Sequence, residues 1–406
     1  MSDTLAPPAG MPSTHPAGPD PLARGMEPSP AQEAARREFA AFVDAHVAPF
    51  AGEWDRAAAT PPEVVRRVAG TGWLGALLPR EVGGRGMDWA TFGLLNEELG
   101  RGCSSIRSLL TVHSMCAFAV QRWGGRELKA RLLPQLAAGE VIGAFGLSEP
   151  NVGSDASAVE TVAAAEGDGY VIDGRKKWTT YGQIAGAYLV FARSEGKPVA
   201  FLVERDAPGL TVEPLRGITG TRASMLAELR FEGCRVPKSN RLGGPGFGIA
   251  VALSALEVGR FSVASGTVGL VRACLDASLA YASTRHQYGS AIGEHQLVQR
   301  MLTEMATGWR AARLLCRRAA CLRDAGDPGA GQEIFVAKYF ASQAATRAAL
   351  DAVQIHGANG CSEDHPVERY LRDSRVMEII EGSTQIQQVT IARNELQAFA
   401  AAAPAQ

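Results

Sequence analysis

The sequence has no excess of charge of either sign. Of its 406 residues, 41 are lysine or arginine and 42 are aspartate or glutamate, which gives a formal net charge of -1. Proteins that bind nucleic acid or an anionic membrane surface usually carry a basic excess, so we expect neither partner. No stretch approaches 18 uninterrupted apolar residues, and we therefore expect no membrane-spanning helix.

Paired cysteines are absent as well. The seven cysteines are scattered along the chain, with no Cys-x-x-Cys pair among them. An odd, dispersed set is typical of reduced thiols and not of a disulfide framework or a zinc site. We therefore expect a cytoplasmic protein without a metal centre.

The sequence also lacks four common catalytic motifs. It contains no Walker A lysine motif, no H-E-x-x-H and no G-x-S-x-G elbow. No G-x-G-x-x-G joins a strand to a helix, and the nearest string, GGPGFG at 243–248, has the wrong spacing. Four common enzyme classes therefore lose their main support.

Residues 1–30 are rich in proline, which the rest of the chain uses sparingly. They hold eight of the 22 prolines, with Gly, Ser and Thr between them and no apolar run. Such a segment does not match a secretory signal, and it cannot bury enough surface to offset its ordering entropy. We predict a disordered tail and assign it no function.

The rest of the chain divides into three regions. In residues 31–143 apolar side chains recur three and four apart, which predicts a helical domain. Residues 144–242 hold short β-rich runs separated by turn strings such as SEGK and DAPG, which predict an antiparallel β domain. Long helical segments joined by short Gly-rich turns in residues 243–406 predict an antiparallel four-helix bundle. The expected fold is mostly α with a central β domain.

The string VMEIIEGSTQIQQ offers a carboxylate suited to proton abstraction. Its plain interpretation makes Ser383 or Thr384 a helix cap, with Glu381 merely favoured near the helix N-terminus. Its functional interpretation places Glu381 in a dry cleft, where a raised pKa makes it a base for a weakly acidic C–H such as the α-proton of a thioester. Gly382 would let the backbone approach the ligand.

Further strings could hold a flat, polar cofactor. GAFGLSEPNVGSDASAVE offers hydroxyls and backbone N–H groups, and RKKWTTYG offers a tryptophan that could stack on a ring. RHQYGSAIGEHQ and QIHGANG each follow a long helix, so Arg285 could serve a pyrophosphate, and Gln354 with Gly357 could approach a nucleotide. The plain interpretations are a turn, a core tryptophan, and helix ends with their cation and glycine stop.

In this order, the strings resemble the acyl-CoA dehydrogenase family across residues 32–398. The resemblance implies an N-terminal helical domain, a middle β-barrel, a C-terminal four-helix bundle, and a homo-oligomer that is a dimer or tetramer. It also implies FAD as the cofactor, held partly across a subunit interface. The residues expected to bind FAD are Leu147, Ser148, Ser154, Trp178, Thr180, Arg285, Gln296, Gln354, Gly357, Ser383 and Gln385.

The resemblance implies a mechanism too. Glu381 would take the α-proton, a hydride from the β-carbon would pass to flavin N5, and an electron-accepting flavoprotein would take the electrons. Some members place the base on the long helix in an L-x-x-E-R string, but here the string is LEVGR, with Gly259 in that place and Arg260 after it. Departures at Ile380, at Gln388 and in WTT, where the family has Tyr, Arg and W-I-T, concern the substrate more than the flavin.

Arg107 is the only formally charged residue in 103–121. A buried arginine needs a partner, and the plain interpretation is a salt bridge to Glu97 or Glu98. The string IRSLLTVHS instead resembles the glutaryl-CoA dehydrogenase segment whose arginine grips the distal carboxylate of the substrate. The residues expected to line the substrate are Arg107, Ser108, Arg260 and Gly382.

The stretch CSSIRSLLTVH also resembles dehydrogenases of polyketide extender-unit pathways, which act on short hydroxylated acyl groups on an acyl carrier protein. The expected function is dehydrogenation of a short, polar acyl thioester on CoA or on a carrier protein, because both present the same phosphopantetheine arm. Three alternatives stay open: a catabolic enzyme of the glutaryl-CoA type, a flavin oxidase or monooxygenase, and a scaffold without activity. Retention of Glu381 favours the dehydrogenase.

Overall fold

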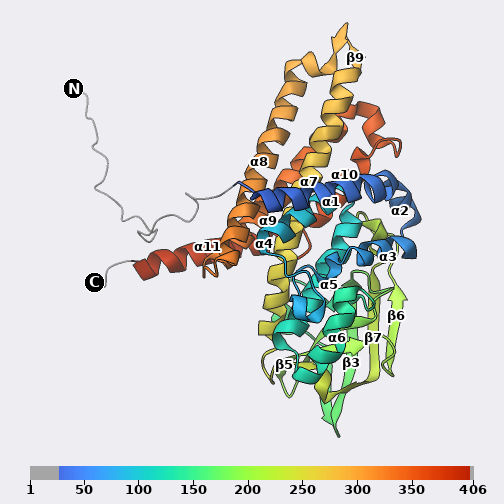
Figure 1. Ribbon diagram of the computed structural model, residues 1–406, viewed down its shortest axis with the longest axis vertical. Coiled ribbons are helices and arrows are strands. Elements are labelled where there is room, and N and C mark those ends of the chain that lie inside the picture. Colours follow the sequence, from blue (N-terminus) through green and yellow to red (C-terminus); the bar gives the residue numbers. More distant parts are fainter. Residues whose placement is uncertain (1–26, 403–406) are drawn as a thin grey trace, which may run out of the picture.

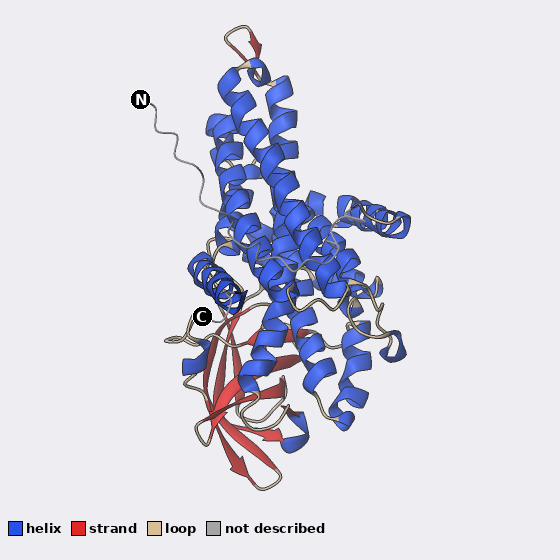
Figure 2. Ribbon diagram, turned by 90° about the vertical axis from the view of Figure 1, so that its left-hand side faces the viewer, coloured by secondary structure: helices blue, strands red, loops and turns tan. Residues whose placement is uncertain are grey.

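The computed structural model describes residues 27–402 (Figure 1). The molecule is elongated, with a β-sheet at one end and long C-terminal helices that extend to the other end. Figure 2 shows the sheet at one end, helices along the rest of the molecule, and a short strand hairpin at the opposite tip. The expectation of a disordered tail falls almost wholly on residues 1–26, which lie outside the described range.

The N-terminal helices begin where side chains can cap them. The Ser29 side chain accepts a hydrogen bond from Gln32 N, and the Gln32 side chain accepts one from Ser29 N, so the two form a capping box. Asp88 caps a later helix by accepting from Thr91 N. The helices are α1 (Pro30–His46), α2 (Ala51–Ala57), α3 (Pro62–Gly70), α4 (Trp89–Gly102), α5 (Ser104–Trp123) and α6 (Arg126–Ala138).

The central sheet has the strand order β6-β7-β3-β2-β4-β5-β8, and β1 pairs with β4. The sequence predicted an antiparallel unit, but β1 and β2 both run parallel to β4, so the sheet is mixed. Neither strand is joined to β4 by a hairpin, which would have forced antiparallel pairing. The strands are β1 (Gly143–Gly146), β2 (Val162–Glu166), β3 (Gly169–Thr179), β4 (Ala187–Ser194), β5 (Lys197–Glu204), β6 (Leu210–Pro214), β7 (Ala227–Pro237) and β8 (Arg241–Leu242).

The C-terminal helical domain is built around one long helix. At 37 residues, α7 is about 56 Å long, and it packs against α4, α5, α8 and α9. It is long and apolar enough to cross a membrane, but 72% of its most apolar stretch is buried inside the protein, as expected for a central core helix. These helices are α7 (Gly248–Thr284), α8 (Gln296–Asp324), α9 (Ala330–His356), α10 (Val367–Met377) and α11 (Thr384–Ala402), and a hairpin of β9 (His286–Gln287) and β10 (Ser290–Ala291) closes the tip.

Small residues let the neighbouring helices approach α7 closely. A Cβ at Gly269 would overlap the Glu97 carbonyl of α4, and a Cβ at Gly266 would lie 2.7 Å from Arg107 Cδ of α5. On the α9 side, buried alanines such as Ala341 and Ala345 occupy the interface core. The middle of α7 therefore lies within reach of α5, of α9 and of the short connection between α10 and α11.

Candidate active site

Glu381 lies in the connection between α10 and α11, in an unusual backbone conformation. Both Glu381 and Gly382 have positive φ angles, of 56° and 88°. Glycine adopts such angles freely, but a glutamate there is uncommon and persists only where its surroundings impose it. This strained turn directs the Glu381 side chain back toward α7.

The helix start that the plain interpretation of this string predicts is present in the structure. Helix α11 begins at Thr384, and Ile386 N donates a weak, 3.4 Å hydrogen bond to Ser383 Oγ. Ser383 is thus the cap of α11, and the same turn that starts this helix carries Glu381.

The carboxylate of Glu381 is buried although part of the residue is accessible. Its Oε2 atom has no hydrogen-bond partner among the described residues. Burial raises the pKa of Glu381 to about 7, while the positive charges of Arg260, Lys338 and Arg107 keep it from rising further. A carboxylate with a pKa near neutrality is both ionised and basic enough to remove a weakly acidic proton.

Gly259 provides the space that this carboxylate occupies. A Cβ at this position would overlap Glu381 Oε2 and would lie 2.7 Å from Met115 Sδ. Position 259 of α7 is where some members of the family that the sequence resembles carry their base. Here the Glu381 side chain occupies the space next to that position. Any side chain at position 259 would therefore have to displace the Glu381 carboxylate.

Three side chains hold the backbone carbonyls of the Glu381 turn. Arg260 Nε and Gln387 Nε2 donate to the Glu381 carbonyl at 3.2 and 3.1 Å. Lys338 Nζ donates to the Gly382 carbonyl at 2.7 Å, and Gln387 Nε2 also donates to it at 3.0 Å. Donors from α7, α9 and α11 therefore converge on two consecutive peptide groups.

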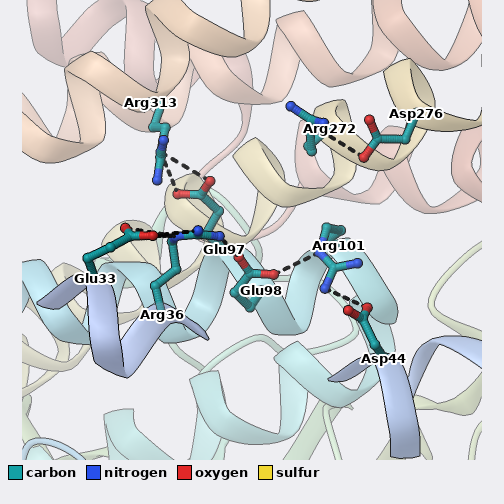
Figure 3. A network of polar contacts seen from close by, with 9 residues as sticks. All are labelled: Glu33, Arg36, Asp44, Glu97, Glu98, Arg101, Arg272, Asp276 and Arg313. Atoms are coloured by element: carbon teal, nitrogen blue, oxygen red, sulfur yellow. Dashed lines mark hydrogen bonds and ion pairs between the residues drawn. The ribbon is translucent and has the colours of Figure 1, made fainter. Parts of the chain in front are cut away.

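The predicted salt bridge of Arg107 to Glu97 or Glu98 is wrong. Both carboxylates pair with residues of α1, α4 and α8 and belong to a separate network of ion pairs (Figure 3). Other arginines pair with them, and neither carboxylate forms an ion pair with Arg107 among the described residues. The partners are Arg313 for Glu97, at 3.2 Å, and Arg36 and Arg101 for Glu98, at 3.1 and 2.7 Å.

Arg107 is instead a buried cation that forms no ion pair within 4 Å in the described part of the chain, although the charges of Glu381 and Asp373 act on it from farther away. Only 1% of it is exposed. Its guanidinium donates to Thr111 Oγ1 and contacts Met377 Sδ, each at 3.0 Å, and burial lowers its pKa to about 10. The neighbouring Ser108 is also buried, but its hydroxyl donates to Ser104 O within α5.

Arg107 and Glu381 lie along the same face of α7. The Glu381 carboxylate lies against Gly259, and the Arg107 side chain lies against Gly266, seven residues later on α7. Between them, Ser262 Oγ lies 2.5 Å from Thr111 Oγ1, which accepts from Arg107. Positions separated by three and seven residues share a helix face, and seven residues span roughly 10 Å. The base and the cation are therefore one to two helical turns apart.

Sequence models of three domains match almost the whole described chain. The N-terminal, middle and C-terminal domains of acyl-CoA dehydrogenases match residues 29–140, 144–234 and 246–396. The chain belongs to the acyl-CoA dehydrogenase family. It is accordingly an oxidoreductase that uses FAD.

Known acyl-CoA dehydrogenases resemble it along most of their length. The mitochondrial short-chain specific acyl-CoA dehydrogenase of Rattus norvegicus is 38% identical over 364 residues, which cover 88% of each chain. A glutaryl-coenzyme A dehydrogenase solved with glutaryl-CoA is 35% identical, with a TM-score of 0.89 over 92% of this chain and 96% of that one. FkbI, described as serving biosynthesis of the methoxymalonyl extender unit of a polyketide, is 35% identical, with a TM-score of 0.82 over 88% and 99%.

The first group of residues expected to bind FAD lies at the sheet end of this acyl-CoA dehydrogenase. Trp178 is 52% exposed and has a positive φ of 65°, so the interpretation of it as a core tryptophan is wrong. A large ring held in a strained conformation at the surface suits stacking on a flat heterocycle. Lys177 N donates to Ser148 O at 2.8 Å, so the Leu147–Ser148 and Trp178–Thr180 segments lie side by side. Ser154 is an exposed residue further along the same connection.

A second group of expected FAD residues lies at the far tip of the long helices. Arg285 and Gln296 flank the β9–β10 hairpin, and Gln354 and Gly357 lie at the end of α9. The rings of Tyr281 and His356 stack at 4.2 Å and bring these helix ends together. The sheet and this hairpin are at opposite ends of the molecule (Figure 1), so one chain does not bring the two groups together. Ser383 and Gln385 lie beside Glu381 instead.

Three polar residues at these sites were not predicted from the sequence. Lys338 and Gln387 hold the Glu381 turn. Lys176, buried in β3, forms a 2.6 Å ion pair with Glu149 and donates to Leu147 O at 3.2 Å. The composition of α9 offered one signal for Lys338, which is the only lysine in this alanine-rich helix. A lysine is rarely buried without a partner, so its presence in an apolar helix could have indicated a specific role.

Proposed function

We propose that this acyl-CoA dehydrogenase oxidises a short acyl thioester that carries a polar or anionic group at its distal end, with Glu381 as the base. One observation carries the substrate class. Arg107 is a buried cation with no carboxylate partner in residues 27–402, on the same face of α7 as Glu381. A distal carboxylate or hydroxyl of the acyl group would complete its hydrogen bonds.

The spacing along α7 supports a short acyl chain. The base and Arg107 are separated by at most roughly 10 Å along the helix. A proton acceptor must lie roughly 3 Å from the α-carbon, and the distal group must lie about 3 Å from the guanidinium. What remains between the two accommodates only a few carbon–carbon bonds.

Each residue then has a defined task. The Glu381 carboxylate removes the α-proton, and the electron pair left on the α-carbon is delocalised onto the thioester carbonyl. FAD supplies the acceptor for the hydride that leaves the β-carbon. Arg260 and Lys338 keep the charge of the Glu381 carboxylate stable before the proton transfer, and Arg107 fixes the far end of the acyl group so that the α-carbon stays in reach.

Two of the similar proteins support the proposed carriers. The relative that binds glutaryl-CoA supports a CoA thioester, and the relative from extender-unit biosynthesis supports an acyl carrier protein. We infer a cytoplasmic homo-oligomer in which the tip residues of one subunit reach the FAD of another, and an electron-transferring flavoprotein as oxidant. We also infer the β-barrel and the four-helix bundle that are usual for the family.

The substrate class is tested by anaerobic bleaching of the enzyme-bound flavin with a matched pair of thioesters. Glutaryl-CoA and valeryl-CoA have the same chain length and differ in the distal carboxylate. We expect faster bleaching with glutaryl-CoA, or with a short hydroxylated acyl group on CoA or on a carrier protein. A clear preference for valeryl-CoA would contradict a polar acyl pocket.

The Glu381→Gln variant provides the matched control for the base. It should keep its bound FAD, because the amide has the same shape, and lose bleaching with every thioester. Bleaching at the wild-type rate by this variant would contradict the assignment of the base. Reduced enzyme that reoxidises rapidly in air would favour a flavin oxidase instead.

A further inference from the structure

Lys338 is a buried cation whose position relative to Glu381 calls for an explanation. None of its surface is exposed, and it forms no ion pair within 4 Å in the described chain; its ammonium donates to the Gly382 carbonyl at 2.7 Å. Burying a charge against a neutral peptide group is costly unless a nearby opposite charge compensates. Two carboxylates act on this charge: that of Glu381, one residue away from the carbonyl, has the larger effect, and that of Glu378 the smaller.

The charged groups around this turn come from every element packed against it. Arg260 projects from α7, with its guanidinium carbon 4.5 Å from the centre of the Phe335 ring of α9. Lys338 follows Phe335 by three residues, so it lies on the same face of α9. Glu378, in the connection after α10, accepts from Thr346 and pairs with Arg375. Arg107 approaches from α5.

We propose that Lys338 is a positioning residue for the base. Its ammonium anchors the Gly382 carbonyl and thereby holds the left-handed backbone that places the Glu381 carboxylate against Gly259. Gln387 donates to the same carbonyl from α11 but is neutral. Of these two donors, only Lys338 brings a positive charge near the Glu381 carboxylate. This inference rests on the proposed role of Glu381 and adds a residue that does not touch substrate.

A dead-end thioester tests the proposal without requiring turnover. In 3-thiabutyryl-CoA a sulfur replaces the β-carbon, so the compound can lose its α-proton but has no β-hydride to give. The enolate next to oxidised flavin produces a long-wavelength absorbance band, and the pH midpoint of this band reports the proton affinity of the base. The band is measured in the FAD-loaded full-length enzyme and in Lys338→Met, Lys338→Gln and Lys338→Arg.

We expect the pH midpoint to rise by about one unit in Lys338→Met and Lys338→Gln, because removing a nearby cation favours the protonated carboxylate. The band should also be weaker at its plateau, since the turn is no longer held, while the affinity for the thioester stays near that of the wild type. Lys338→Arg should recover most of the wild-type midpoint. Arg347→Met removes an exposed cation from the same helix and should behave as the wild type.

Three results would overturn the proposal. The first is an unchanged midpoint and amplitude in a folded neutral variant. The second is an equal shift in Arg347→Met. The third is failure of both neutral variants to fold while Lys338→Arg folds, which would assign Lys338 to stability alone. Glu381→Gln separates the hypothesis that Glu381 is the base from the hypothesis that Lys338 positions it. A normal pH-dependent band in that variant would show that Glu381 is not the base, whatever the Lys338 variants show.

Discussion

Lys176 and Arg107 are both buried cations, but their surroundings differ. Lys176 lies in the sheet, 2.6 Å from the Glu149 carboxylate, which also accepts from Thr161 N and Thr161 Oγ1. Arg107 lies between helices, with a hydroxyl and a thioether as its contacts among the described residues. The pair in the sheet is complete within the chain, whereas the cation in the helical core has unfilled capacity for an anion.

The difference separates structural charge from functional charge. A completed buried pair fixes its neighbours, and here it fixes Leu147, whose carbonyl also accepts from Lys176. A buried cation without an anionic partner lowers stability, so its retention needs another reason. The same holds for Glu381, whose Oε2 has no partner in the described chain. Both incomplete groups lie along one face of α7, where a substrate can complete them.

The largest effect is expected from removing the incomplete carboxylate. Glu381→Gln should reduce turnover of an acyl thioester by roughly 10³-fold or more, because the variant has no base for the α-proton. Because the amide removes the cost of burying a charged carboxylate, the melting temperature should stay equal or rise. Steady-state assay and thermal unfolding of the same FAD-loaded sample measure both, and a fall in both together would assign Glu381 a structural role.

Breaking the completed pair should affect stability instead. Lys176→Met leaves Glu149 buried and unpaired, which costs about 3–5 kcal/mol, and it should lower the melting temperature and the FAD content. Replacing both partners, in Lys176→Met with Glu149→Leu, should restore part of the loss. If Lys176→Met were as stable as the wild type, the ion pair with Glu149 would not contribute to stability, and the contrast between Lys176 and Arg107 would fail.

Removing the incomplete cation should affect substrate choice. Arg107→Met deletes charge-assisted hydrogen bonds worth about 1.5–3 kcal/mol, so kcat/KM for glutaryl-CoA should fall roughly 10- to 100-fold while that for butyryl-CoA changes little. Stability should not fall, because the variant removes a desolvated charge. An equal loss for both thioesters would mean that Arg107 does not face the acyl end.

The smallest effect is a shift in pH dependence. Burial raises the pKa of Glu381 to about 7, and only the ionised carboxylate accepts a proton, so activity should rise with pH through about 7. Because Arg107 is one of the cations that hold this pKa down, Arg107→Met should move the rise to higher pH. The profile is measured with butyryl-CoA, which does not need Arg107; a shift to lower pH would contradict the proximity of the two groups.

Local patterns predicted the helical and β regions well, and long-range contacts set the limits. The apolar spacing predicted helices before and after a β region. Helix boundaries such as the start of α11 at Thr384 follow from capping. The parallel pairings of β1 and β2 with β4 depend on which strand happens to lie alongside, and no turn sequence encodes that. The sequence therefore predicted an antiparallel sheet where the sheet is mixed.

The candidate site divides in the same way. Glu381, Gly382 and Ser383 are adjacent in sequence, so their string could be interpreted directly. Lys338 contacts the turn from another helix. This contact depends on the positive φ of Glu381, a backbone conformation that is not predicted for a glutamate from the sequence. Of the two interpretations of Arg107, the salt bridge to Glu97 or Glu98 is wrong because these carboxylates pair with arginines of α1, α4 and α8.

The shared space between Gly259 and the Glu381 carboxylate constrains how such enzymes can change over time. A side chain at position 259 and a carboxylate from position 381 meet in one volume, so a chain that places a side chain at 259 must also move the Glu381 carboxylate. We therefore expect a substitution at position 259 to be accompanied by a change at position 381 in related sequences.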